Sequence, residues 1–165
     1  MSSLRRIAII SPYALDVYGG VQEQALGMSR ELTSQGYEVM LLSPEGGDLI
    51  SETPAIVERF GGCIKIPANG SKAPISLSPT ASRRVRQAID RFDPQVVHFH
   101  EPFAPIVGYV ELFSRSERIH VGTFHRSGGG PAYQLTKPLL KVALSHLDAI
   151  VAVSDRAAET LRTAT

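Results

Sequence analysis

Features that mark disulfide-bonded, zinc-binding and membrane proteins are scarce in this sequence. Its 165 residues include a single cysteine, Cys63, so no disulfide can form within the chain and no cysteine cluster indicates structural zinc. The longest apolar runs, such as residues 149–153, are far shorter than a membrane span, and no apolar signal core follows the arginines near the N-terminus. We therefore expect a soluble cytoplasmic protein that is not exported.

Charge of one sign is not in excess either. The formal net charge is +1, and charged residues make up 20% of the chain. Bulk electrostatics therefore do not indicate a nucleic-acid partner, and any partner must be recognised locally. A chain of this length buries about two-thirds of its unfolded surface in one core. Residues 1–165 are therefore expected to form a single domain.

Motifs of the common nucleotide-binding and hydrolytic enzymes are also absent. The paired glycines Gly19 and Gly20 lack the G-x-G-x-x-G spacing that wraps a dinucleotide pyrophosphate, and no P-loop lysine and serine pair is found. An NAD-linked enzyme is therefore only a weak alternative. No nucleophile elbow or Ser-His-Asp spacing is visible, and Cys63 lies in an expected strand, where packing is commoner than reactivity.

What the sequence does contain is an alternation of strand and helix patterns. Apolar, β-branched runs predict strands at residues 7–10, 39–43, 56–60, 63–66, 96–100, 119–124 and 148–153. Amphipathic patterns predict helices at residues 21–36, 79–92, 104–113 and 137–147 and after Ser154, and residues 67–79 are expected to form an exposed loop. This order predicts a doubly wound, Rossmann-like α/β domain with a mostly parallel sheet and helices on both faces.

Polar candidates collect where the expected strands end, which is the edge at which such sheets bind ligands. They are Tyr13 to Gln22, Asn69, Ser71, Glu101 and His125. The helix after Gly19 and Gly20 points unpaired amides at this edge, which suits a single phosphate or a phosphorylated sugar. A tight turn that needs positive φ explains the paired glycines equally well.

Three histidines and two acids are candidates for chemistry. His98 and His100 share one face of a strand, but no third ligand at zinc spacing accompanies them, so packing is the better explanation. His125 ends a strand at the ligand edge, where a neutral imidazole could bond a substrate hydroxyl, carry a proton or simply be satisfied by a nearby carbonyl. Asp16 and Glu101 could orient sugar hydroxyls or cap adjoining amides.

Several short segments together resemble the N-terminal half of the family 4 retaining glycosyltransferases, and within them the phosphatidyl-myo-inositol mannosyltransferases. They are Pro12-Tyr13, Asp16-Val17, Gly19-Gly20-Val21-Gln22, Gly36-Tyr37-Glu38-Val39, Ile66-Pro67-Ala68-Asn69-Gly70-Ser71, Val96-Val97-His98-Phe99-His100-Glu101-Pro102, Thr123-Phe124-His125 and Ala152-Val153-Ser154. The resemblance implies a GT-B enzyme, in which two Rossmann-like domains face each other across a cleft. The first holds a hydroxyl acceptor and the second a nucleotide sugar, with GDP-mannose favoured over a UDP-sugar.

The resemblance also implies roles for individual residues. Gly19 and Gly20 would approach the donor phosphate, and His125 would lie near the transferred sugar and support the transition state. The acceptor pocket would be lined by Tyr13, Asp16, Gln22, Asn69 and Ser71. The basic helix face of Arg83, Arg84 and Arg86 would meet an anionic membrane at the inner face, although a solvated face is the commoner explanation for such a pattern. No metal ion or cofactor is implied.

The implied reaction retains configuration by a same-face route, in which the leaving phosphate helps to deprotonate the incoming hydroxyl. Oriented amides and His125 would stabilise the developing charge. The motifs of the donor domain are not found in these 165 residues, so this part alone is expected to be inactive. The alternative from another class is a non-catalytic Rossmann module that binds a ligand or a membrane.

Overall fold

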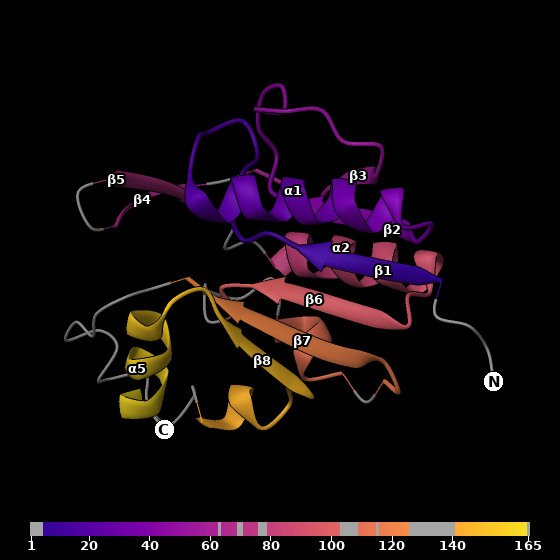
Figure 1. Ribbon diagram of the computed structural model, residues 1–165. Coiled ribbons are helices and arrows are strands. Elements are labelled where there is room, and N and C mark those ends of the chain that lie inside the picture. The colour runs from indigo at the N-terminus through magenta and orange to yellow at the C-terminus, as the bar shows by residue number, and fades with distance from the viewer. Residues whose placement is uncertain are drawn as a thin grey trace.

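The structure is a computed structural model, and it describes residues 5–62, 64–68, 71–75, 79–102, 109–114, 116–125 and 141–164. Its centre is a six-stranded sheet in the order β3-β2-β1-β6-β7-β8, in which every neighbouring pair is parallel (Figure 1). The strands are β1 (Arg6–Ile10), β2 (Glu38–Ser43), β3 (Ile56–Arg59), β6 (Val96–His100), β7 (Ile119–Phe124) and β8 (Ala149–Ala152). This confirms the predicted doubly wound α/β class.

Helices cover the two faces of the sheet because successive side chains of a strand point to opposite faces. Ile7 and Ile9 of β1 belong to one buried cluster with α1 (Gly20–Ser34), whereas Ala8 and Ile10 belong to the other with α2 (Pro79–Phe92). The remaining labelled helices are α3 (Tyr109–Leu112) and α5 (Asp155–Ala164). Two buried faces explain why β1 is apolar without alternation.

The ends of two helices follow the sequence signals. After α1, Gly36 adopts φ +89°, and the amides of Gly36 and Tyr37 donate to the carbonyls of Thr33 and Leu32 at 3.0 and 3.1 Å. This left-handed cap satisfies carbonyls that the helix itself leaves free. At the start of α5, the Oγ of Ser154 accepts a hydrogen bond from the amide of Ala157 at 3.2 Å, so the serine just before the predicted helix caps it.

The predicted loop over residues 67–79 is wrong for most of its length. β4 (Ile64–Ala68) and β5 (Ser71–Ile75) pair antiparallel in a separate two-stranded sheet. Two residues, Asn69-Gly70, separate the strands, and this dipeptide is a strong hairpin signal. The prolines at 67 and 74 argued against strands, but a two-stranded ribbon has a free edge on each strand, where proline is tolerated.

Other predicted boundaries lie partly outside the described residues. Of the predicted helix over 104–113 the structure describes Tyr109–Leu112, and of the helix over 137–147 it describes a helical turn at residues 141–144. Cys63 lies outside the described residues. Within the described part of the chain, no helix has the length and apolar character needed to cross a bilayer.

Candidate functional site

The carboxyl ends of β1, β6 and β7 meet at one edge of the sheet. Ile10 is in register with Phe99, and His100 is in register with Thr123. The turn after β1, Glu101 after β6 and His125 after β7 therefore leave the sheet on the same side, from which the β4–β5 hairpin also projects (Figure 1). The sequence placed these candidates at one edge, and the parallel register explains why.

The paired glycines open α1. Gly19 is the N-cap residue with φ −177°, which is extended backbone, and no side chain caps the helix. The first amide with an intrahelical partner is that of Glu23, which donates to the Gly19 carbonyl at 3.0 Å. Neither Gly19 nor Gly20 has a positive φ, so the tight-turn explanation is wrong.

The room available for a side chain differs between the two glycines. A Cβ on Gly19 would lie 2.4 Å from Oε1 of Gln22, whereas a Cβ on Gly20 would meet nothing within 4 Å. Gln22 is 6% exposed and belongs to the first turn of α1. The Gln22 side chain thus occupies the space where a Cβ on Gly19 would lie, and Gly20 leaves its backbone uncovered. An uncapped helix start with uncovered backbone is suited to an anion.

Asp16 ties the turn after β1 to the loop after β2. Its Oδ2 accepts a hydrogen bond from the amide of Gly47 at 2.7 Å, and a Cβ on Gly46 would lie 2.6 Å from its Oδ1. This Oδ1 is buried, and the described part of the chain supplies no hydrogen-bond partner for it. Asp16 thus caps an adjoining amide, as one of the two explanations held, and it keeps one oxygen free.

The other predicted acceptor residues are distributed between the turn and the hairpin. Tyr13 is half-buried, and its amide donates to the Oγ of Ser11 at 3.3 Å, which orders the start of the turn. Ser71 is the first residue of β5, and Asn69 lies outside the described residues. The structure therefore brings Tyr13, Asp16 and Gln22 into one turn-and-helix segment at the sheet edge.

The histidines form a connected group. The rings of His98 and His100 stack with their centroids 5.0 Å apart, and Nε2 of His98 lies 2.7 Å from Oγ1 of Thr123. Nδ1 of His100 lies 3.0 Å from Nε2 of His125. The amide of His125 donates to the carboxylate of Glu101. His125 is thus held by a second histidine ring and a carboxylate, and its ring is not satisfied by a carbonyl.

Burial keeps these rings neutral. Desolvation, together with the neighbouring histidines, lowers the pKa of His98 to about 4 and that of His100 to about 2. Desolvation also lowers the pKa of His125. At neutral pH each ring therefore carries one proton, so each has one donor and one acceptor nitrogen.

Metal ligation was the weaker interpretation of the histidines. Among the described residues, no group of three or more histidine, cysteine, aspartate or glutamate side chains could hold a metal ion. The contacts of His98 and His100 are instead those of packed, hydrogen-bonded rings.

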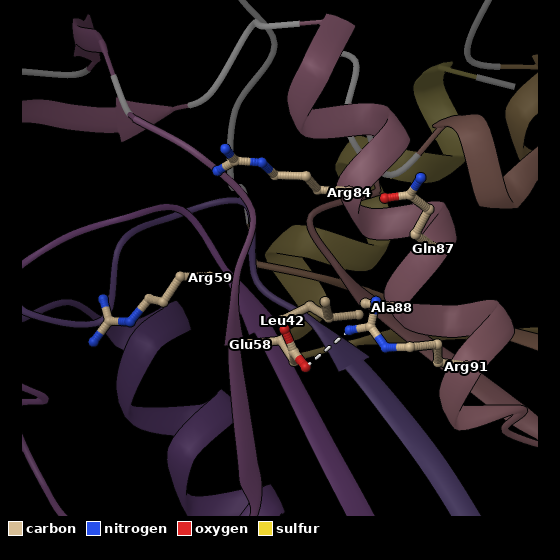
Figure 2. Close-up of a pocket in the computed structure, with 7 residues that line it drawn as sticks. All are labelled: Leu42, Glu58, Arg59, Arg84, Gln87, Ala88 and Arg91. Atoms are coloured by element: carbon tan, nitrogen blue, oxygen red, sulfur yellow. Dashed lines mark hydrogen bonds and ion pairs between the residues drawn. The ribbon is translucent and has the colours of Figure 1, made fainter.

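The three predicted membrane-facing arginines lie exposed on α2. Arg84 forms an ion pair with Glu45 at 3.3 Å, and Arg86 forms one with Asp90 at 3.9 Å. Arg84 also borders a groove of about 190 Å³ between α2 and β3 (Figure 2). Its lining residues are Leu42, Glu58, Arg59, Arg84, Gln87, Ala88 and Arg91. The helix is basic, but acidic neighbours offset two of its three candidate cations.

Sequence reasoning missed how His125 is held. The sequence places Glu101 near the site, but it does not predict that Glu101 adopts φ +46° or that its carboxylate accepts a bond from the His125 amide. A signal was present, because His100 and His125 both lie at the carboxyl ends of expected strands. Only the pairing of β6 with β7 shows that these ends are neighbours.

Comparisons with known proteins cover almost the whole chain. The family described as Glycosyltransferase Family 4 matches residues 18–164. A phosphatidyl-myo-inositol mannosyltransferase of Propionibacterium freudenreichii is 31% identical over 160 residues, which are 93% of this chain and 42% of the relative. A protein of the same name from Mycolicibacterium smegmatis is 37% identical over 122 residues, which are 74% of this chain and 31% of the relative. The chain thus spans less than half of each relative.

Solved structures share the fold. A sucrose-phosphate synthase from Thermosynechococcus elongatus superposes with a TM-score of 0.70 at 16% identity, covering 96% of this chain and 45% of the other. A glycosyltransferase from Rickettsia africae superposes with a TM-score of 0.60 at 15% identity, covering 93% of this chain and 38% of the other. The match over residues 18–164 includes the paired glycines, the three histidines and the basic helix. The chain therefore belongs to glycosyltransferase family 4.

Proposed function

We propose that this chain is the acceptor-binding half of a retaining glycosyltransferase that uses a nucleotide sugar. The proposed donor is GDP-mannose, with a UDP-sugar as the alternative, and the proposed acceptor is a hydroxyl of an inositol-type or lipid molecule. The observation that carries the proposal is the carboxyl edge of the sheet, where an uncapped helix start and a neutral histidine occur together. Neither a metal ion nor a cofactor is required.

The start of α1 is suited to the donor phosphate. Its first-turn amides have no side-chain cap, and the backbone at Gly20 is open because no Cβ covers it. These amides supply hydrogen-bond donors and the positive end of the helix dipole. In the proposed reaction they bind the phosphate that leaves the sugar and gains negative charge.

His125 is the proposed catalytic residue. The acceptor oxygen forms a bond to the anomeric carbon as the bond from that carbon to the phosphate oxygen breaks, and the hydroxyl proton passes to the leaving phosphate. A neutral imidazole fixed at the sheet edge contributes a hydrogen bond to this centre. A charged imidazole would have to overcome the desolvation that lowers the pKa of His125.

The acceptor is proposed to bind Tyr13, Asp16, Gln22, Asn69 and Ser71. Support comes from Asp16, whose Oδ1 is an acceptor that no donor among the described residues uses. The same proposal gives Arg83, Arg84 and Arg86 an anionic membrane surface at the inner face as partner, since all three are exposed on one helix. A donor-binding domain in the same protein would complete the cleft.

The test is glycosyl transfer by a full-length protein. Purified enzyme is incubated with GDP-mannose or UDP-sugars and with phosphatidylinositol or free inositol, and the product is followed by mass spectrometry. We expect transfer from GDP-mannose, and a loss of about 100-fold or more in His125→Ala. His146→Ala is the matched control, because His146 is an exposed histidine remote from this edge.

Unchanged turnover in His125→Ala would remove that residue from the mechanism. Absence of transfer with every donor would return the protein to the alternative of a non-catalytic binding module, which membership of the family does not favour.

A further inference from the structure

We propose that His100 is a positioning residue that holds His125 as the tautomer protonated on Nδ1, so that His125 presents an N–H donor to the substrate. This inference deepens the proposed function, because it rests on the role given there to His125.

The position of the His100 ring determines the geometry of the His100–His125 pair. His100 ends β6 and is 1% exposed, and its ring stacks on that of His98 at 5.0 Å. His98 is anchored in turn by Oγ1 of Thr123, 2.7 Å from its Nε2. Because β6 and β7 are paired, Nδ1 of His100 reaches to 3.0 Å from Nε2 of His125. The direction of this bond therefore determines the tautomer of His125.

The direction follows from the second nitrogen of His100. Its Nε2 is buried and has no hydrogen-bond partner among the residues that the structure describes. If the proton of His100 were on Nε2, a buried N–H would be left without an acceptor, which is rare and costly in folded proteins. With the proton on Nδ1, only a lone pair is left unmatched. His100 therefore donates through Nδ1, and Nε2 of His125 accepts.

Each ring holds a single proton at neutral pH, because burial lowers the pKa of both histidines. With Nε2 as an acceptor, the proton of His125 must be on Nδ1. That nitrogen has no hydrogen-bond partner among the described residues. An N–H donor is suited to an oxygen that gains negative charge, and the same nitrogen cannot act as a base while it holds the proton.

The backbone of His125 is held separately. Its amide donates to the carboxylate of Glu101, whose backbone lies in the left-handed region at φ +46°. A non-glycine residue in this region is strained unless its surroundings compensate, and such residues concentrate at functional sites. Glu101 thus fixes the backbone position of His125, and His100 determines which ring nitrogen of His125 carries the proton.

The direct test is the protonation state of the ring. Long-range 1H–15N correlation spectra of the full-length protein, labelled with 15N at histidine, identify at pH 7 which nitrogen of His125 carries the proton. We expect Nδ1–H in the wild type, a mixture of tautomers in His100→Phe, and recovery in His100→Asn, because the asparagine amide restores an N–H donor near the position of Nδ1. His146→Phe is the control, because His146 is an exposed histidine outside the group of His98, His100 and His125.

An Nε2–H ring in the wild type, or a His125 tautomer that His100→Phe does not change, would overturn the proposal. In full-length enzyme, we expect His100→Phe to lower kcat about tenfold with little change in KM, and His100→Asn to restore most of the rate. If the spectra agree but no sugar is transferred by the wild type, the glycosyltransferase proposal fails while the tautomer assignment stands.

Discussion

Nη1 of Arg118 lies 3.1 Å from Oε1 of Glu111, in a buried ionic cluster at the end of the sheet opposite His125. The Glu111 side chain is 1% exposed and that of Arg118 is 17% exposed, and Nε2 of His120 lies 3.5 Å from the same carboxylate oxygen. Burial raises the pKa of Glu111, but the contact with His120 and the charge of Arg118 outweigh burial and lower it overall. This cluster joins α3 to the start of β7.

We expect Arg118→Met to destabilise the protein by about 3 kcal/mol, because a buried carboxylate would lose its counter-charge. Urea denaturation at pH 7 measures the change. The double variant Glu111→Leu, Arg118→Met removes both charges and should regain much of the stability. If Arg118→Met were no less stable than the double variant, the unpaired Glu111 carboxylate would cost no stability, and the expectation would be wrong.

Stability is expected to fall as the pH is lowered from 7 to 5. The folded protein keeps His98 and His100 neutral, with pKa values lowered to about 4 and about 2, whereas unfolded histidine titrates near its ordinary value of 6.5. Below that value the unfolded chain binds more protons, so each histidine that stays neutral costs about 1.4 kcal/mol per pH unit.

Urea titrations at several pH values test this slope. His100→Phe has no titratable group at this position, so its free energy of unfolding should depend less steeply on pH between 7 and 5. Equal slopes in the wild type and in the variant would mean that His100 is not held neutral by the fold.

We expect substitution of Gly20 to affect stability and activity differently. In Gly20→Ala the new Cβ meets nothing within 4 Å, and alanine favours the helix by about 0.5–1 kcal/mol relative to glycine. We therefore expect an unchanged or higher melting temperature together with weaker use of the nucleotide sugar, because the Cβ covers the backbone proposed to meet the phosphate.

Gly19→Ala makes the contrasting variant. Its Cβ would lie 2.4 Å from Oε1 of Gln22, so the Gln22 side chain must move, and we expect a lower melting temperature. Thermal denaturation and donor KM measure the two effects. A Gly20→Ala enzyme with wild-type donor KM would exclude close approach of the phosphate at this position.

Membrane binding should depend unequally on the three arginines. Arg84 and Arg86 have acidic partners in Glu45 and Asp90, whereas no ion pair is found for Arg83 among the described residues. Each arginine near an anionic surface contributes about 1 kcal/mol. We expect Arg83→Gln to reduce co-sedimentation with phosphatidylglycerol vesicles about fivefold, and Arg86→Gln to reduce it less. Equal binding of the wild type to phosphatidylcholine vesicles would refute the idea.

Most of the fold could be predicted because its signals are local. Apolar β-branched runs marked every strand of the main sheet, and Gly36 and Ser154 marked two helix ends. The hairpin was missed because residues 67–79 are rich in proline, serine, asparagine and glycine and show no apolar period, which is typical of a loop. In the structure, β4 and β5 pair with each other, and the outer edge of each strand stays free.

The candidate site could be predicted only as a set of separate residues. The sequence placed His125, Glu101 and Asp16 at one edge, but their partners come from other strands and loops. The bond from His100 to His125 depends on the β6–β7 register, and the bond from Gly47 to Asp16 depends on where the loop after β2 passes. The Glu111–Arg118 pair gave no signal, because no spacing rule links a helix acid to an arginine just before a strand.

The hairpin of β4 and β5 has a consequence for how specificity can diverge. Its strands bond to each other and form a sheet of their own, apart from the six-stranded one. The register of this hairpin is therefore set apart from the register of the main sheet. In the proposed enzyme, where Ser71 of the hairpin binds the acceptor, a different acceptor would require changes in this short two-stranded sheet and not in the buried framework.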